Sequence, residues 1–203
     1  MAMPAPPPLY HEGARRLQDR FDTRRLADRI AERLGREALT VDDRNFVASQ
    51  SIFILATADA DGRPECSYKG GEPGFIRALD ATHLAFPSYD GNGMFKSLGN
   101  VLVNPHVGLL FIDFASGQRL RVQGRAAIDF VASPVAEFEG AQCVVRVEVS
   151  RVFPNCPRYV HRMQQTGISE FAPRPGHVPP VPAWKHFEMF RDVLPAGDPG
   201  REG

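Results

Sequence analysis

The chain has 203 residues, which is enough for one well-buried domain with terminal extensions but not for two large domains. Its 43% apolar content is typical of a globular protein, and its 24 basic residues balance 24 acidic ones. No net charge therefore favours nucleic acid or an anionic membrane as a partner. The apolar runs are far shorter than the roughly 20 residues of a membrane helix, and residues 1–9 lack the apolar core of a signal peptide. We expect a soluble, cytoplasmic protein.

The cysteines and histidines predict neither disulfides nor a metal site. The chain has three cysteines, an odd number, at positions Cys66, Cys143 and Cys156, and no two of them form a C-x-x-C motif. This indicates reduced thiols. The six histidines show no tight ligand spacing.

Residues 1–40 predict an N-terminal extension that contains one amphipathic helix. Asp22 or Thr23 can cap this helix, and Gly35 ends it. Its apolar stripe consists of three residues spaced four apart: Leu26, Ile30 and Leu34.

Residues 41–165 predict the main domain. Thr40-x-x-Asp43 resembles a capping box that opens a short helix. Six or seven short strands with turn signals between them follow, which favours an antiparallel barrel over a parallel α/β sheet. The expected strands are 51–58, 64–69, 75–79, 83–86, 107–114, 118–129 and 143–153.

One helix is expected inside the barrel, from about Gly93 to Val103. Asn92 can cap it, and Asn104-Pro105 stops it. The expected apolar stripe is Met94, Phe95, Leu98, Val101 and Leu102.

The C-terminal part predicts another short helix over 157–165 and then an arm over 166–203. Five prolines between residues 172 and 182 indicate an extended segment. Trp184–Leu194 is apolar enough to dock as a helix, either on a second subunit or over a site.

The strand 64–69 carries the first candidate binding residues. Alternation places Ser67 and Lys69 on one face and Cys66 and Tyr68 on the other. Lys69 runs into Gly70-Gly71, a combination that suits an anionic ligand approached closely by the backbone. The alternative is an ordinary solvated lysine at a strand end.

The start of the inner helix is the second candidate. Free amides and the helix dipole at an N-terminus attract anions. Lys96, Ser97 and Asn100 lie within the next turns and can add donors. The alternative is a capped helix whose polar residues face water.

The segment 118–125 is the third candidate. Arg119, Arg121, Gln123 and Arg125 share one strand face, where three arginines repel one another unless an anion or acidic neighbours compensate. A solvated exterior paired to Asp and Glu is the alternative.

No nucleophile–base arrangement stands out around Ser67, Cys66 or Cys156. Phosphate-binding features without acid–base machinery predict that a cofactor supplies the chemistry and that no side chain is catalytic.

The stretch Phe53–Arg125 resembles the pyridoxamine 5′-phosphate oxidase-like, FMN-binding split-barrel superfamily. The motifs that carry the resemblance are Leu55-Ala56-Thr57-Ala58, Asp61-Gly62-Arg63-Pro64, Lys69-Gly70-Gly71-x-x-Gly74-Phe75, Tyr89-x-Gly91-Asn92, Ser97-Leu98-Gly99-Asn100, Asn104-Pro105-x-Val107-Gly108-Leu109 and Arg119-Leu120-x-Val122-x-Gly124-Arg125.

The resemblance implies a mainly β (α+β) fold, a six-stranded antiparallel Greek-key split β-barrel with flanking helices, and a homodimer with FMN in clefts between the subunits. The cofactor-binding residues that it implies are Ser67, Tyr68, Lys69, Gly70, Asn92, Lys96, Ser97, Asn100, Gln118 and Arg121. Gln118 and Arg121 would come from the strand opposite. The substrate-binding C-terminal residues of the oxidase have no clear match here, so oxidation of pyridoxine phosphate is not implied.

Two functions follow from the resemblance. The first is an FMN-dependent oxidoreductase that acts on a small molecule, with NADH or NADPH as a possible donor and the deazaflavin F420 as a less favoured cofactor. The second is a non-catalytic protein that binds flavin, F420 or haem.

Overall fold

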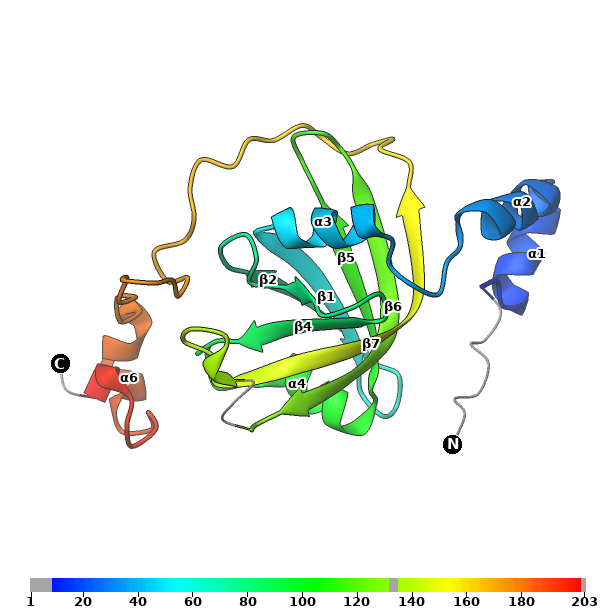
Figure 1. Cartoon of the computed structure of the whole chain (residues 1–203). Helices are drawn as coiled ribbons and strands as arrows, with labels where there is room; N and C mark the ends of the chain where they lie inside the picture. Colours follow the sequence, from blue (N-terminus) through cyan, green and yellow to red (C-terminus); the bar gives the residue numbers. More distant parts are fainter. Residues whose placement is uncertain (1–8, 132–134, 202–203) are drawn as a thin grey trace.

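The computed structural model describes residues 9–131 and 135–201. Its strands form one antiparallel sheet in the order β2-β1-β5-β6-β7-β4-β3, which curls into a split barrel (Figure 1). The strands are β1 Ile52–Ala58, β2 Pro64–Gly70, β3 Arg77–Ala78, β4 His83–Ser88, β5 His106–Ile112, β6 Arg119–Asp129 and β7 Cys143–Asn155. The predicted mainly β, α+β fold is confirmed. There are seven strands rather than six, because Arg77–Ala78 pairs with β4 as a two-residue edge strand.

Alternating apolar residues fill the barrel, as their period of two requires. Phe53 on β1 is 1% exposed and meets the rings of Phe75, Phe86 and Phe111 at centroid distances of 5.8, 5.0 and 5.4 Å. The register of β6 against β7 shifts at Gln123/Gly124. A Cβ at Gly124 would lie 2.3 Å from the carbonyl oxygen of Glu148, so the close approach of these strands requires glycine there.

The helices of the described residues are α1 Glu12–Arg20, α2 Arg24–Leu34, α3 Val41–Ser49, α4 Lys96–Val103, the 3₁₀-helix η1 Ala183–His186, α6 Glu188–Arg191 and the 3₁₀-helix η2 Pro199–Arg201. The capping box of α3 is confirmed in full. Thr23 and Gly35 are the cap positions of α2, as expected, although the Thr23 side chain donates or accepts no capping bond. Helix α1 was not predicted from the sequence.

The inner helix α4 begins at Lys96, so the predicted start at Gly93 and cap at Asn92 are wrong. Gly93 and Phe95 adopt positive φ values of 73° and 46°, which break the helix. The Asn92 Oδ1 instead accepts the backbone N–H of Met94 at 3.1 Å in a turn. Of the expected stripe, only Leu98 and Val101 are buried.

The helix expected over 157–165 is also wrong. Tyr159 has a φ of 68°, and the Met163 amide bonds to the carbonyl of Phe114, which keeps the segment against the β5–β6 loop. Trp184–Leu194 is helical only in two short pieces, η1 and α6.

Helices α1 and α2 lie on one side of the barrel, and α6 lies on the opposite side (Figure 1). We call residues 9–36 the N-terminal hairpin and residues 166–201 the C-terminal arm. Within residues 9–131 and 135–201, no helix is long and apolar enough to cross a membrane.

Candidate functional site

A cleft of about 1250 Å³ lies between the C-terminal arm and one end of the barrel. Its barrel wall consists of β2 and the loop 88–95 that leads into α4. Its other wall consists of arm residues, of which two are charged, Lys185 and Asp198, and the rest are apolar: Pro182, Trp184, Phe190, Val193, Leu194 and Pro195. We call this space the barrel–arm cleft.

The inner row of β2 supplies three polar side chains to the cleft. Glu65, Ser67 and Lys69 are half-buried and alternate with the exposed Cys66 and Tyr68, which confirms the predicted faces of this strand. Burial lowers the pKa of Lys69, and the nearby Glu65 carboxylate opposes that shift. Within the described residues Lys69 forms no hydrogen bond or ion pair, so its ammonium is available to an anion in the cleft.

A hydrogen-bonded network joins Glu65 to the start of α4. The Ser97 Oγ lies 2.7 Å from the Glu65 Oε2 and 2.9 Å from the Ser67 Oγ. Thr57 donates to the same Glu65 oxygen at 3.3 Å and accepts from the Asn100 Nδ2 at 3.0 Å. The anion-attracting N-terminus of α4 therefore already faces a carboxylate of the chain itself.

The loop before α4 brings further groups to the rim of the cleft. Asn92 and Lys96 are exposed there, and the Lys96 ammonium has no ion-pair partner in the part of the chain that the structure describes. Burial raises the pKa of the Tyr89 phenol, which lines the same wall.

A buried lysine fastens the arm to this loop. Lys185 is 2% exposed, and its Nζ lies 2.6 Å from the Asp90 Oδ2 and 2.7 Å from the Asp198 Oδ2. Burial alone would lower the pKa of Lys185, but the hydrogen bonds to Asp198 and Asp90 outweigh it and the pKa is raised. The same contact lowers the pKa of Asp198. The cleft thus has a fixed far wall.

The structure brings most of the predicted site residues together. Six of them line the barrel–arm cleft: Ser67, Tyr68, Lys69, Asn92, Lys96 and Ser97. Gly70 lines an adjoining cavity of about 710 Å³ that shares Tyr68 with the cleft, and Asn100 lies behind Ser97 in the Glu65 network. Gln118 directly precedes β6 and Arg121 lies on it; both are exposed, and neither lines the cleft or the adjoining cavity. Their roles remain predictions.

The predicted sharing of one face of β6 by the three arginines and Gln123 is confirmed; Arg119 is half-buried there and the other three residues are exposed. The Arg119 guanidinium donates to the carbonyl of Cys156, Arg121 lies 5.7 Å from the ring centroid of Phe153, and Arg125 contacts His106. Among residues 9–131 and 135–201, no ion pair joins these three arginines to Asp or Glu, so the alternative of an exterior face paired to acidic residues is wrong for them.

Sequence reasoning missed Glu65, Asp90 and Lys185. Alternation along β2 could have found Glu65, because it lies two residues before Ser67 on the same face. Asp90 and Lys185 are 95 residues apart, and no local pattern indicates their ion pair. Among the described residues, no group of three or more His, Cys, Asp or Glu side chains is placed to hold a metal ion.

The family model for pyridoxamine 5′-phosphate oxidase matches residues 39–155, which is more than half of the chain and includes every strand. The chain belongs to the pyridoxamine 5′-phosphate oxidase family. The match includes the barrel wall of the cleft and excludes both the N-terminal hairpin and the C-terminal arm. A search of the curated proteins finds no match.

Solved structures with the same kind of barrel include HupZ of Group A Streptococcus, with 18% identity over 62% of this chain and 99% of that one at a TM-score of 0.48. A pyridoxamine 5′-phosphate oxidase homologue from Lactobacillus delbrueckii has 25% identity over 58% and 95% of the two chains at a TM-score of 0.47. The haem storage protein HutZ of Vibrio cholerae has 19% identity over 57% and 93% at a TM-score of 0.39. At these scores the likeness extends to no ligand or reaction.

Proposed function

We propose that this member of the family binds FMN in the barrel–arm cleft and uses it for redox chemistry on a small molecule. The observation that carries the proposal is Lys69, a half-buried ammonium without a hydrogen bond or ion pair within the described residues, in a cleft that also has an aromatic and aliphatic wall. A buried cation favours an anionic ligand. The FMN phosphate carries close to two negative charges at neutral pH, as other phosphomonoesters do.

Different residues of the cleft would contact different parts of FMN. Lys69, Lys96 and the Asn92 amide would hold the phosphate at the rim of the barrel wall. Trp184 and Phe190 on the arm would flank the apolar ring system. Bound FMN supplies hydride transfer, and the protein positions it and excludes water.

Glu65 limits where the phosphate can lie. Its carboxylate already faces the N-terminus of α4 through Ser97, and like charges at that distance repel. We therefore assign the phosphate to the side-chain ammonium groups of Lys69 and Lys96 rather than to the backbone amides at the start of α4, which revises the predicted role of Ser97.

We extend the proposal to a homodimer. Ile54 and Leu110 are paired neighbours on the outer face of the sheet, and Tyr68 and Arg121 flank them in register on β2 and β6. A second copy seated on this face would bring its own Gln118 and Arg121 toward the cleft, which one chain alone does not do. The small-molecule substrate, the NADH or NADPH donor and the cytoplasmic location are parts of the same proposal.

The second candidate is a flavin-binding protein without catalysis. Apart from Glu65 and the two lysines Lys69 and Lys96, the side chains of the network around the α4 start are hydroxyls and amides, which bind ligands but are weak acids and bases. Anaerobic mixing with NADH or NADPH separates the two candidates. Bleaching of bound flavin within seconds indicates an oxidoreductase, whereas no reduction by either donor indicates a binder.

The test of the proposal is the identity and retention of the chromophore. We expect the purified protein to carry FMN, identified by mass spectrometry after heat release. Lys69→Ala and Asn92→Ala should each retain less flavin while remaining folded, and Arg16→Ala on α1 is the control for loss of a surface cation. A colourless protein that takes up no added flavin would contradict the proposal.

A further inference from the structure

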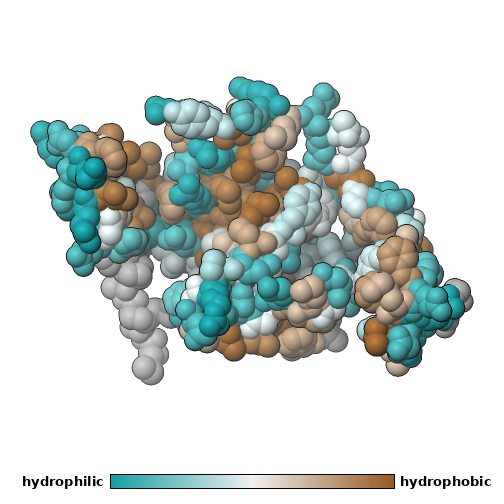
Figure 2. All heavy atoms as spheres, turned by 180° about the vertical axis from the view of Figure 1, so that it is seen from behind, coloured by the Kyte–Doolittle hydropathy of each residue, from teal (hydrophilic) through white to brown (hydrophobic). Residues whose placement is uncertain are grey.

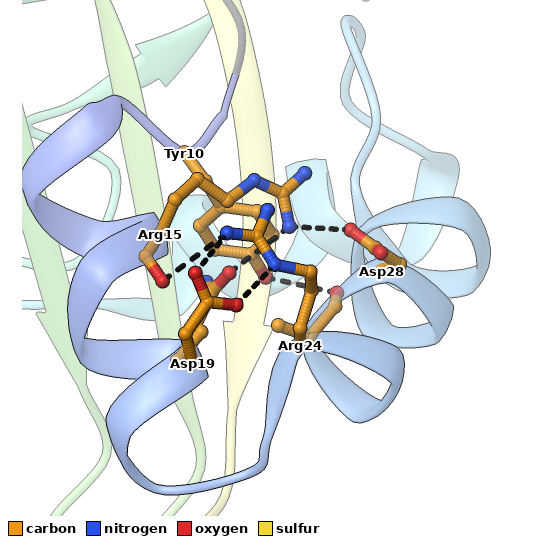
Figure 3. Close-up of polar contacts among 7 residues, drawn as sticks. Tyr10, Arg15, Asp19, Arg24 and Asp28 are labelled. Atoms are coloured by element: carbon orange, nitrogen blue, oxygen red, sulfur yellow. Dashed lines mark hydrogen bonds and ion pairs between the residues drawn. The ribbon is translucent and has the colours of Figure 1, made fainter.

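The polar contacts of the N-terminal hairpin join its two helices at the surface, and its large apolar side chains are exposed as well. Figure 3 shows the charged side chains between α1 and α2: Arg15 pairs with Asp28 at 2.6 Å, and Arg24 with Asp19. The Tyr10 hydroxyl also crosses the hairpin to the carbonyl of Ala27 at 3.1 Å. These contacts join two helices that share no hydrophobic core.

The large apolar side chains of the hairpin lie on its surface. Neither α1 nor α2 contains a buried residue. The exposed fractions are 59% for Leu17, 69% for Phe21, 60% for Leu26, 43% for Ile30 and 42% for Leu34. Since an amphipathic helix gains its stability by covering its apolar stripe, this surface is that of a helix pair whose partner is missing from the single chain.

The apolar surface of the hairpin faces the same side of the molecule as an apolar part of the barrel. Viewed from behind, both appear in brown, the hairpin next to the barrel (Figure 2). The hairpin joins the barrel through the bridge of Arg36 to Val152 and the burial of Leu39 in the core, so it is held at the side of the barrel and does not lie over it. An occupant on this side would touch both surfaces at once.

The distribution of charge along the chain favours one occupant over the others. Up to residue 36 the sequence has eight arginines and five acidic residues, whereas the remainder has 16 basic and 19 acidic residues. The hairpin is therefore basic, and the rest of the same chain is acidic by the same margin. A second copy of this chain offers the complementary charge, whereas an anionic membrane would be attracted by the hairpin but repelled by the acidic remainder.

We propose that the N-terminal hairpin clasps the barrel of a second copy, with Leu26 and Ile30 buried in the contact. A two-fold arrangement makes the two clasps identical, each hairpin packing on the other subunit. The inference rests on the proposed homodimer and adds to it an interface element that lies outside the residues matched by the family model.

Sedimentation of the full-length protein tests the clasp. Leu26→Ser combined with Ile30→Ser should weaken the dimer at least about tenfold, because the contact loses two buried aliphatic side chains. Val178→Ser combined with Met189→Ser is the matched control, since these arm residues are 89% and 73% exposed. The control should dimerise as the wild type does. Circular dichroism checks that all variants fold.

Photo-crosslinking from position 30 gives a second readout that does not depend on dimer strength. In a mixture of ¹⁴N- and ¹⁵N-labelled protein we expect cross-links that join the hairpin of one label to the barrel of the other. An undiminished dimer in the Leu26→Ser, Ile30→Ser variant, cross-links within one chain only, or a monomer that binds anionic vesicles would each overturn the clasp. Flavin content measured on the same samples tests the proposed function separately. Absence of flavin together with cross-links between subunits would contradict the proposed cofactor and leave the clasp supported.

Discussion

The two extensions of this barrel differ in the side chains that they bury and expose. The C-terminal arm encloses its charge, with the Lys185 ammonium 2% exposed between two carboxylates, and turns Trp184 and Leu194 to the barrel–arm cleft. The N-terminal hairpin pairs its charges at the surface between its own helices and leaves Leu26 and Ile30 uncovered. A buried ion pair with apolar neighbours is a contact completed within one chain. The hairpin has the composition of a contact that a second chain completes.

The largest expected effect on stability is in the barrel between the two extensions. Phe53→Ala should cost about 3–5 kcal/mol of unfolding free energy, because it removes a buried ring that touches three others. Denaturant unfolding measures this cost. Leu26→Ala on the hairpin is the comparison and, at protein concentrations low enough for the protein to be monomeric, should leave the unfolding of the barrel almost unchanged. A similar cost at both positions would show that the hairpin packs on its own barrel.

Next in size is release of the arm by Lys185→Met. This substitution removes the cation from between Asp90 and Asp198 and leaves their carboxylates uncompensated, so the arm should open at least about tenfold more often. Limited proteolysis between residues 166 and 201 measures the opening. Lys96→Met removes an unpaired ammonium from the same cleft and serves as the control. Equal cleavage of the two variants would show that Lys185 does not hold the arm.

The same latch predicts a pH dependence of smaller size. Because the pKa of Asp198 is lowered in the folded protein, the stabilisation that Asp198 gives to the closed arm is complete above the ordinary carboxyl pKa and is lost as pH falls through the folded value. The pKa of Lys185 is raised in the folded protein. The stabilisation that Lys185 gives to the closed arm is therefore complete below the ordinary lysine pKa and is lost as pH rises through the folded value. Trp184 is the only tryptophan, so its emission reports the arm directly. The acid transition should disappear in Lys185→Met, and its persistence would assign it to other groups.

The smallest effect is expected at the charges inside the hairpin. Arg24→Ala should raise the pKa of Asp19, because the Arg24 hydrogen bond is what lowers it. The pair is exposed, so the melting temperature should change by no more than about 2 °C. A carboxyl NMR titration measures the pKa, with Arg16→Ala as the control. An unchanged pKa would show that the inter-helix pair does not form in solution.

The sequence predicted those parts of the molecule that local chemistry determines. Alternation along β1, β2 and β6 located the strands within one or two residues and assigned Lys69 and Ser67 to one face. The capping box at Thr40 was equally local. The error at the start of α4 came from two residues with positive φ, one of them Phe95, which no propensity favours.

The remaining features depend on contacts between distant segments. Asp90 meets Lys185 across 95 residues, and Ser97 meets Glu65 across 32. Polar side chains far apart in sequence carry no pattern until the barrel brings them together. The helix predicted over 157–165 failed for the same reason, since the Phe114 carbonyl binds Met163 from another part of the chain.

Fluorescence titration of Trp184 with FMN tests the central claim most directly. Trp184 lines the barrel–arm cleft, and flavin absorbs where tryptophan emits, so bound FMN should quench its emission saturably. FMN should bind at least about tenfold more tightly than riboflavin, because only its phosphate reaches Lys69 and Lys96. Lys69→Ala should reduce that difference. Quenching that does not saturate, or equal affinities for FMN and riboflavin in the wild-type protein, would contradict an anionic flavin site in this cleft.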